Sequence, residues 1–175
     1  LAGIPGSVGG VVRMNAGGRY GSVSDALVAL RLLGRDGQIR TRSSLEIEFE
    51  YRNAKLDGAV VLAATFALEV ADIDDVRQEY RRIWMEKSAS QPAMAHRSAG
   101  CVFRNPPGYS AGALIDQAGL KGERRGGAEI SPRHANFIVA HPGARARDVL
   151  ELIDLAKDRV RQTHGLELEL EVDVW

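Results

Sequence analysis

Three side chains, far apart in the sequence, could take part in chemistry: a thiol at Cys101, a guanidinium at Arg52 and a carboxylate at Glu171. The thiol is the sharpest of these because, with an ordinary pKa of about 8.5, it stays mostly protonated at neutral pH and can donate a proton. It lies in a small-residue turn, residues 98–100, that leads into a predicted short strand at Val102-Phe103. A lone cysteine is, however, more often a buried packing group. Residue type alone leaves both interpretations of Cys101 open.

Arg52 and Glu171 each have an ordinary alternative. Arg52 follows Tyr51 in a polar stretch and is by default a surface cation. Four acids alternate near the end of the chain, namely Glu167, Glu169, Glu171 and Asp173. Because alternation places all four on one strand face, a solvated face explains them, and the period gives no reason to prefer Glu171.

A glycine-rich segment opens the chain. Residues 3–10, Gly-Ile-Pro-Gly-Ser-Val-Gly-Gly, are predicted to form a loop, and a second glycine cluster follows at residues 15–21. Glycine lets backbone N–H groups come close to a phosphate or a flavin ring, although tight turns are the commoner use of such clusters. The segment matches neither the dinucleotide-binding fingerprint nor a P-loop.

The histidines do not indicate a metal site. His134 could contact a ligand or could simply precede a buried strand, and the four histidines show no H-x-x-x-H spacing and no pairing with the cysteine. We therefore expect no bound metal.

Composition excludes several classes of protein. Lys plus Arg and Asp plus Glu are both 23, so there is no net charge to hold a nucleic acid. The single cysteine cannot form an intrachain disulfide, and no apolar run reaches the roughly 18 to 20 residues that cross a bilayer. A cytoplasmic protein without membrane or nucleic-acid partners is expected. Because Leu1 is followed at once by the glycine-rich loop, we also expect the natural chain to extend upstream.

Hydrophobic periodicity predicts an α+β protein. Strands are predicted where apolar residues cluster or alternate, at residues 26–33, 59–68, 136–140 and 168–174. Helices are predicted where apolar residues recur every three or four positions, from residue 72 to the proline at 92, over 111–118 and over 147–164 with Gly165 after the last turn. A boundary near residues 90–92 divides the chain into domains 1–91 and 92–175.

Read together, six segments resemble the successive signatures of the UDP-N-acetylenolpyruvoylglucosamine reductases, in order. They are residues 3–17, 51–52, 98–106, 111–122, 126–139 and 168–172. The modest gap between Arg52 and Cys101 resembles the shorter type of the family. The resemblance implies the second half of a vanillyl-alcohol-oxidase-type (PCMH-type) FAD-binding domain over 1–91, followed by a small α+β substrate-binding domain over 92–175.

The resemblance also implies a reaction and a set of site residues. The family reduces UDP-N-acetylenolpyruvoylglucosamine to UDP-N-acetylmuramate for peptidoglycan synthesis, with FAD and NADPH as cofactors. Its catalytic positions fall on Arg52, Cys101 and Glu171. Positions that contact the nucleotide-sugar substrate fall on Tyr51, Asn105 and His134. Positions that face FAD fall on Gly3, Ile4, Pro5, Gly6, Ser7, Val8, Gly9, Gly10, Asn15 and Gly17. A monomer is expected.

This chain departs from the family pattern in four places. Cys101 stands where serine is usual, Asn53 stands where serine is common, and the turn at residues 17–21 is one residue longer. The family's Gly-x-Gly-Ser-Asn loop, which grips the FAD pyrophosphate, does not occur in these 175 residues. Weak FAD binding is therefore expected. Two alternatives stay open: another flavoprotein oxidoreductase of the same superfamily, or a non-catalytic remnant that binds a nucleotide sugar.

Overall fold

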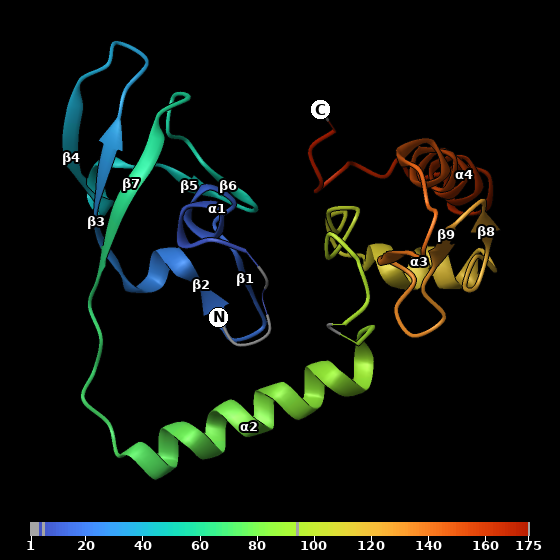
Figure 1. Ribbon diagram of the computed structural model, residues 1–175, viewed down its shortest axis with the longest axis horizontal. Helices are drawn as coiled ribbons and strands as arrows, with labels where there is room; N and C mark the ends of the chain where they lie inside the picture. Colours follow the sequence, from blue (N-terminus) through green and yellow to red (C-terminus); the bar gives the residue numbers. More distant parts are fainter. Residues whose placement is uncertain (1–3, 5, 94, 175) are drawn as a thin grey trace. The chain divides into compact units, whose positions relative to one another are not determined.

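The computed structural model describes residue 4 and residues 6–93 and 95–174 (Figure 1). It divides into two compact units, residues 1–83 and 84–175, and each is described by itself. The division falls inside helix α2, Ile73–Ser90, which confirms the helix predicted from residue 72 to Pro92. The domain limits 1–91 and 92–175 stay a prediction, since a division between packed units is not in itself a domain boundary.

The first unit is built on a three-stranded antiparallel sheet. Strand β3, Leu27–Leu33, lies between β4, Ile39–Ser43, and β7, Val60–Phe66. These strands confirm the two apolar segments that the sequence indicates. The turn between β3 and β4 closes through a hydrogen bond from Gly34 N to Gln38 O at 2.9 Å.

Helix α1, Val8–Arg13, covers this sheet and corrects the prediction that residues 3–10 are all loop. Two glycines weaken this helix, each by about 1 kcal/mol relative to alanine. Burial of Val11 and Val12 in the core, together with an N-cap hydrogen bond from Gly10 N to Ser7 Oγ at 3.1 Å, outweighs that cost.

Short elements complete the first unit, and two of them form hairpins. The first hairpin pairs β1, Gly17–Gly18, with β2, Gly21–Ser22, and the second pairs β5, Phe49–Glu50, with β6, Asn53–Ala54. Two single-turn 3-10 helices lie at Val23–Ala26 and Ser44–Glu46.

The second unit packs two helices against a small antiparallel sheet. Helices α3, Ala111–Gln117, and α4, Ala146–His164, confirm the two predicted helices. The sheet has the order β10-β9-β8, with β8 at Arg124–Arg125, β9 at Ala128–Ile130 and β10 at Ile138–Ala140. Gly165 ends α4 with φ of +68°, the left-handed conformation that glycine adopts without strain.

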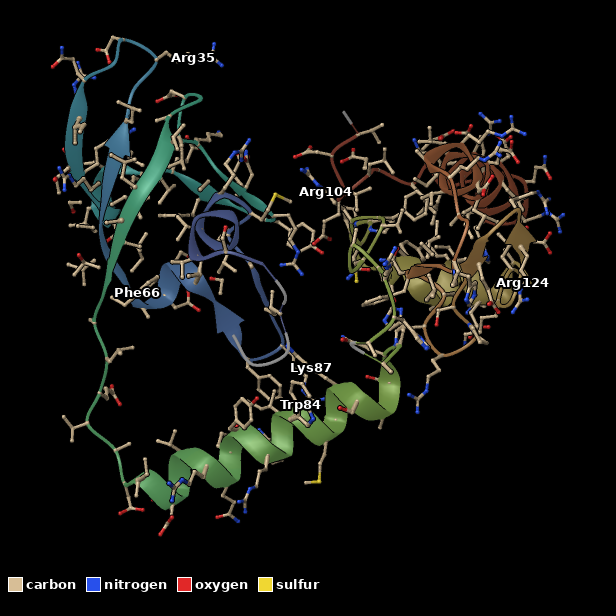
Figure 2. The ribbon with its side chains drawn as sticks, in the orientation of Figure 1. Arg35, Phe66, Trp84, Lys87, Arg104 and Arg124 are labelled. Atoms are coloured by element: carbon tan, nitrogen blue, oxygen red, sulfur yellow. The ribbon has the colours of Figure 1, made fainter. Side chains whose placement is uncertain are left out.

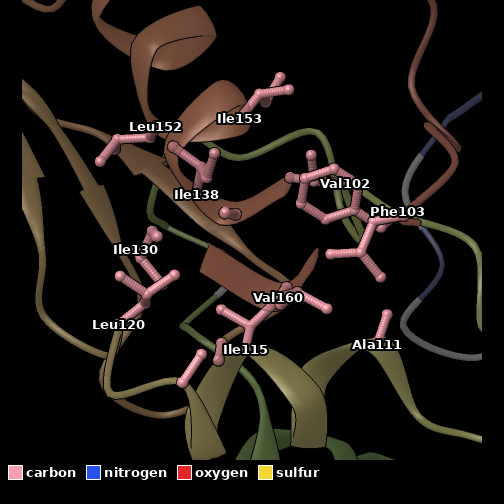
Figure 3. Close-up of a cluster of buried hydrophobic side chains, with 14 of the residues drawn as sticks. Val102, Phe103, Ala111, Ile115, Leu120, Ile130, Ile138, Leu152, Ile153 and Val160 are labelled. Carbon is pink, nitrogen blue, oxygen red and sulfur yellow. The ribbon is translucent and has the colours of Figure 1, made fainter. Parts of the chain in front are cut away.

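Side chains from both helices and from the sheet converge in one core (Figure 3). Phe103, Ile115, Ile130, Leu152 and Val160 are almost completely buried there. Because Phe103 comes from the segment that also contains Cys101, this core anchors the part of the unit that carries the predicted site.

The segment after α4 corrects another prediction. Residues 168–174 alternate as a strand would, yet only Leu170 pairs, opposite Phe103, and the chain bends at residues 171 and 172. The reason is local: the backbone N–H groups of Glu171 and Val172 both point to Val102 O, at 2.8 and 3.4 Å. Two residues thus face one, as in a β-bulge, and the strand cannot continue regularly.

No helix in the described part of the chain combines the length and the apolar character needed to cross a lipid bilayer.

Candidate functional site

Arg52 lies in the two-residue turn of the second hairpin, between Glu50 and Asn53. Its guanidinium carbon is 4.9 Å from the centroid of the Tyr51 ring, a cation–π distance. Arg52 is half-buried and Tyr51 is exposed. The turn therefore presents a stacked arginine and tyrosine together, at the two positions that the resemblance marks.

The backbone of Arg52 is strained. Its φ is +57°, whereas Tyr51 does not have positive φ, so Arg52 occupies the turn position that normally takes glycine or asparagine. A side chain held in this region costs on the order of 1 kcal/mol or more. Strain of this kind persists where surrounding contacts fix the geometry, and it is commoner at functional sites than elsewhere.

The residues predicted to face FAD have differing roles. Gly3 and Pro5 lie outside the described residues, and Ile4 packs against the core of the first unit. Ser7 caps α1, and Val8, Gly9 and Gly10 form the first turn of that helix. Gly6 has φ of +124° and no atom within 4 Å of the place where a Cβ would lie, so its backbone can be approached from outside.

Gly17 and Asn15 have internal explanations. A Cβ on Gly17 would lie 2.5 Å from Gly21 O, so the hairpin itself requires glycine there. The Asn15 side chain is 9% exposed and forms hydrogen bonds within the unit, to Glu50 O at 3.0 Å and from Ser24 N at 3.3 Å. These contacts explain both residues without a ligand, and their predicted contact with FAD stays a prediction.

In the second unit, backbone hydrogen bonds hold the Cys101 segment on both sides. Val102 N donates to Asn136 O at 2.9 Å, and Cys101 forms an isolated bridge with Phe137. On the other side, Glu171 N donates to Val102 O at 2.8 Å. The thiol-bearing segment and the Glu171 segment are therefore direct backbone neighbours, although 70 positions separate the two residues in the sequence (171 minus 101).

The irregular pairing distinguishes Glu171 from the other three acids. Glu167, Glu169 and Asp173 are exposed, whereas Glu171 is half-buried. The sequence period could not predict this difference because all four acids follow the same alternation. Cys101 is also half-buried, so both predicted catalytic groups of this unit lie at the border between core and solvent.

Asn105 and His134 organise the same region. Asn105 Oδ1 accepts a hydrogen bond from Ala111 N, the first residue of α3, at 2.9 Å. The His134 ring lies edge-on to Phe137 at 4.9 Å, and its Nδ1 accepts from Asn136 N at 3.2 Å. That hydrogen bond requires Nδ1 to be unprotonated, so the neutral ring carries its proton on Nε2.

The surroundings of His134 favour the neutral form. Partial burial, and secondly the positive charge of Lys121, lower the pKa of His134 below its ordinary value. A Cβ on Gly112 of α3 would lie 2.9 Å from His134 Cε1, so the helix can approach the ring only because position 112 is glycine. His134 is thus an uncharged, firmly placed side chain at neutral pH.

Arg104, labelled in Figure 2, is a residue that the sequence patterns do not single out. Its backbone N donates to Glu169 O at 2.9 Å, next to the Glu171 pairing, and its Nε is buried with no hydrogen-bond partner in the described structure. A buried donor without an acceptor is costly. The one signal in the sequence was its place in the Phe103-Arg104-Asn105-Pro106 motif.

The second unit contains four of the predicted site residues: Cys101, Glu171, Asn105 and His134. Arg52 and Tyr51 belong to the first unit. Among the described residues, no group of three or more histidines, cysteines and acids could hold a metal ion.

Comparison with known proteins shows which proteins the chain is similar to. Residues 91–175 match the family described as UDP-N-acetylenolpyruvoylglucosamine reductase, C-terminal domain. The reductase of that name from Moorella thermoacetica is 42% identical, over 99% of this chain and 58% of its own length. The one from Syntrophus aciditrophicus is 43% identical, over 98% of this chain and 55% of its own length.

A solved structure supports the same assignment. The crystal structure of UDP-N-acetylenolpyruvylglucosamine reductase (MurB) from Thermus caldophilus matches with a TM-score of 0.87 at 42% identity, covering 99% of this chain and 62% of that one. The chain thus spans somewhat more than half the length of the relatives that it matches. Over nearly its whole length the chain is similar to UDP-N-acetylenolpyruvoylglucosamine reductases.

Proposed function

We propose that this chain carries the substrate-reducing chemistry of a UDP-N-acetylenolpyruvoylglucosamine reductase, forming UDP-N-acetylmuramate for peptidoglycan precursor synthesis. The observation that supports it most is the pairing of the Glu171 segment with the Cys101 segment through Val102 O. This pairing makes the segments that carry Cys101 and Glu171 backbone neighbours, which supports a role for both residues in one site. The proposal extends to a cytoplasmic, monomeric enzyme with FAD and NADPH as cofactors.

The residues available for FAD fit a flavin loosely. Gly6 offers an open backbone, and the first turn of α1 adds glycines at positions 9 and 10. The first unit would then be the second half of a PCMH-type FAD-binding domain. When bound, FAD would supply to the substrate the hydride that NADPH provides.

Arg52 would bind the substrate carboxylate. Hydride addition at the methylene carbon of the enolpyruvyl group leaves negative charge on the neighbouring carbon, delocalised into that carboxylate. A planar guanidinium matches a carboxylate with two parallel hydrogen bonds, and such fixed positive charge is commonly worth a few kcal/mol in a transition state. The turn supports the role because the Arg52 guanidinium lies over the Tyr51 ring, at 4.9 Å from its centroid, so that both residues are presented together.

Cys101 would then protonate the carbon that carries the charge. The S–H bond breaks, a C–H bond forms, and the thiolate that remains takes a proton from solvent before the next turnover. Glu171 would assist by polarising the carboxylate. Asn105, Tyr51 and the neutral ring of His134 would contact the nucleotide sugar.

The two half-reactions test this proposal in the full-length natural protein. Anaerobic mixing with NADPH should bleach the flavin, and addition of UDP-N-acetylenolpyruvoylglucosamine should restore its colour with formation of UDP-N-acetylmuramate. Arg52→Lys keeps the positive charge but loses the planar guanidinium that forms two parallel hydrogen bonds. It should therefore slow only the second step, the reoxidation of the flavin by substrate. An absence of product would refute the function, and equal slowing of both steps would refute the role of Arg52.

A further inference from the structure

The Arg52 turn has little support of its own. β5 and β6 contribute two residues each, and a hairpin this short is marginal without contacts from elsewhere. Arg52 also has the positive φ that an arginine rarely adopts. Side chains from another part of the unit must therefore hold the turn if Arg52 is to point in one direction.

Asn15 holds the residue immediately before the turn. It is the buried asparagine whose Nδ2 donates to Glu50 O at 3.0 Å, while its Oδ1 accepts from Ser24 N at 3.3 Å. Its backbone is fixed as well, since Asn15 N donates to Val12 O at 2.9 Å, although its φ is +39°. The amide thus links the β5 end of the hairpin to the end of α1.

Arg13 holds the residue immediately after the turn. Its Nη1 donates to Asn53 Oδ1 at 2.6 Å and lies 3.4 Å from Ala54 O. Asn53 also donates through Nδ2 to Glu50 Oε2 at 3.3 Å, across the hairpin. Both flanks of the Tyr51-Arg52 turn are therefore tied to the end of α1, through Arg13, its last residue, and Asn15, two positions further on.

We propose that Arg13 and Asn15 are positioning residues that clamp the Arg52 turn. Neither need touch the substrate. The clamp gives a role to Asn53, which stands where serine is common after the arginine. Asn53 Oδ1 accepts the hydrogen bond from Arg13. In this proposal the Asn15 side chain positions the Arg52 turn and does not contact the flavin. The role given to the clamp rests on the proposed function, in which Arg52 binds the substrate carboxylate.

Hydrogen exchange tests the clamp without reference to catalysis. In the full-length protein, Arg13→Met removes the contacts to Asn53 and Ala54 while keeping most of the side chain, and Arg13 is exposed, so folding should survive. Asn15→Asp keeps the acceptor for Ser24 N but removes the donor to Glu50 O. Both variants should speed amide exchange across residues 49–54 by about 10-fold or more. The matched control is Arg31→Met, an exposed arginine of β3, which should leave that exchange unchanged.

Kinetics then test whether the clamp acts through Arg52. Each clamp variant should slow reoxidation of the flavin by substrate about 3- to 10-fold while reduction by NADPH stays within a factor of two, and Arg13→Lys should recover part of the loss. In an Arg52→Ala background, the clamp substitutions should cost nothing further, because residues that act through a shared partner are non-additive.

Unchanged exchange over residues 49–54 in both variants, or additive losses in the Arg52→Ala background, would overturn the proposal. Equal slowing of both half-reactions would also overturn it, as that outcome indicates a general structural role. If the wild type made no UDP-N-acetylmuramate but the variants still loosened residues 49–54, the clamp would stand and the proposed function would fail.

Discussion

Replacing Arg52 should separate stability from activity. Arg52→Gly and Arg52→Ala both delete the guanidinium and its contact with Tyr51, so both should abolish efficient substrate reduction. They differ only in the backbone. Glycine accepts φ of +57° without a clash, whereas alanine keeps the Cβ that makes this region unfavourable. The glycine variant should therefore be the more stable of the two.

The size of the difference follows from two opposing terms. Left-handed backbone costs a residue with a Cβ about 1–2 kcal/mol. Glycine, for its part, gives the unfolded chain more freedom, which costs about 0.4–1 kcal/mol on folding. The balance leaves Arg52→Gly more stable than Arg52→Ala by about 1 kcal/mol. With a urea dependence of about 2 kcal/mol per M, that difference raises the unfolding midpoint by about 0.5 M.

Urea unfolding of the full-length protein, followed by a probe in the first unit, measures this shift. Thr41 in β4 provides the control, since a strand position with ordinary φ should give the reverse order, alanine above glycine by about 0.5–1 kcal/mol. Should Arg52→Ala prove as stable as Arg52→Gly while the Thr41 pair behaves normally, the backbone of Arg52 is not strained and the reasoning from φ is wrong.

Three further predictions concern the second unit. Cys101→Ser should keep substantial activity and Cys101→Ala should lose about 10²-fold in turnover, with normal reduction by NADPH in both; normal turnover of the alanine variant would make Cys101 a packing residue. Arg104→Met should leave stability to urea unchanged or raise it, since it removes a buried donor that has no acceptor among the described residues; a clear loss of stability would show that the Nε has a partner. Because folding lowers the pKa of His134, the unfolded chain binds a proton at higher pH than the folded chain does, so stability should fall as pH drops below about 6.5. Urea unfolding at pH 7.5 and 5.5 should show a smaller loss for His134→Gln. Equal pH dependence of the two proteins would contradict this prediction.

The sequence predicted the regular elements of both units well because their signals are local. α4 shows an apolar stripe with a glycine at the position that follows its last turn, and the structure places both as expected. β3 and β7 are apolar runs bounded by turns. In each case the residues that decide the conformation lie within the element itself, so periodicity and capping are sufficient.

The failures have a different origin. α1 forms in a glycine-rich stretch because Val11 and Val12 bury against residues such as Leu30, which is distant in the sequence. The alternation over 168–174 satisfies a strand pattern, but the only described partner is the short segment at residues 102–104. Tertiary packing decides both cases, and neither local propensity nor a period contains that information.

The predicted catalytic residues share a feature that explains why hydrophobic periodicity could not single them out. Arg52 has positive φ in a turn, Cys101 follows Gly100 with φ of +87°, and Glu171 lies where two N–H groups share one carbonyl. Each position departs from regular backbone, and each departure turns a side chain out of the period that its neighbours follow. Periodic elements bury cores on one face, so their period does not single out an isolated polar side chain. The irregular positions are held by contacts from distant segments: Asn15 for the arginine turn, and Asn136 with the Glu171 segment for the thiol. Substitutions at those holding residues should therefore affect the chemistry more than substitutions of exposed residues on the regular strands and helices.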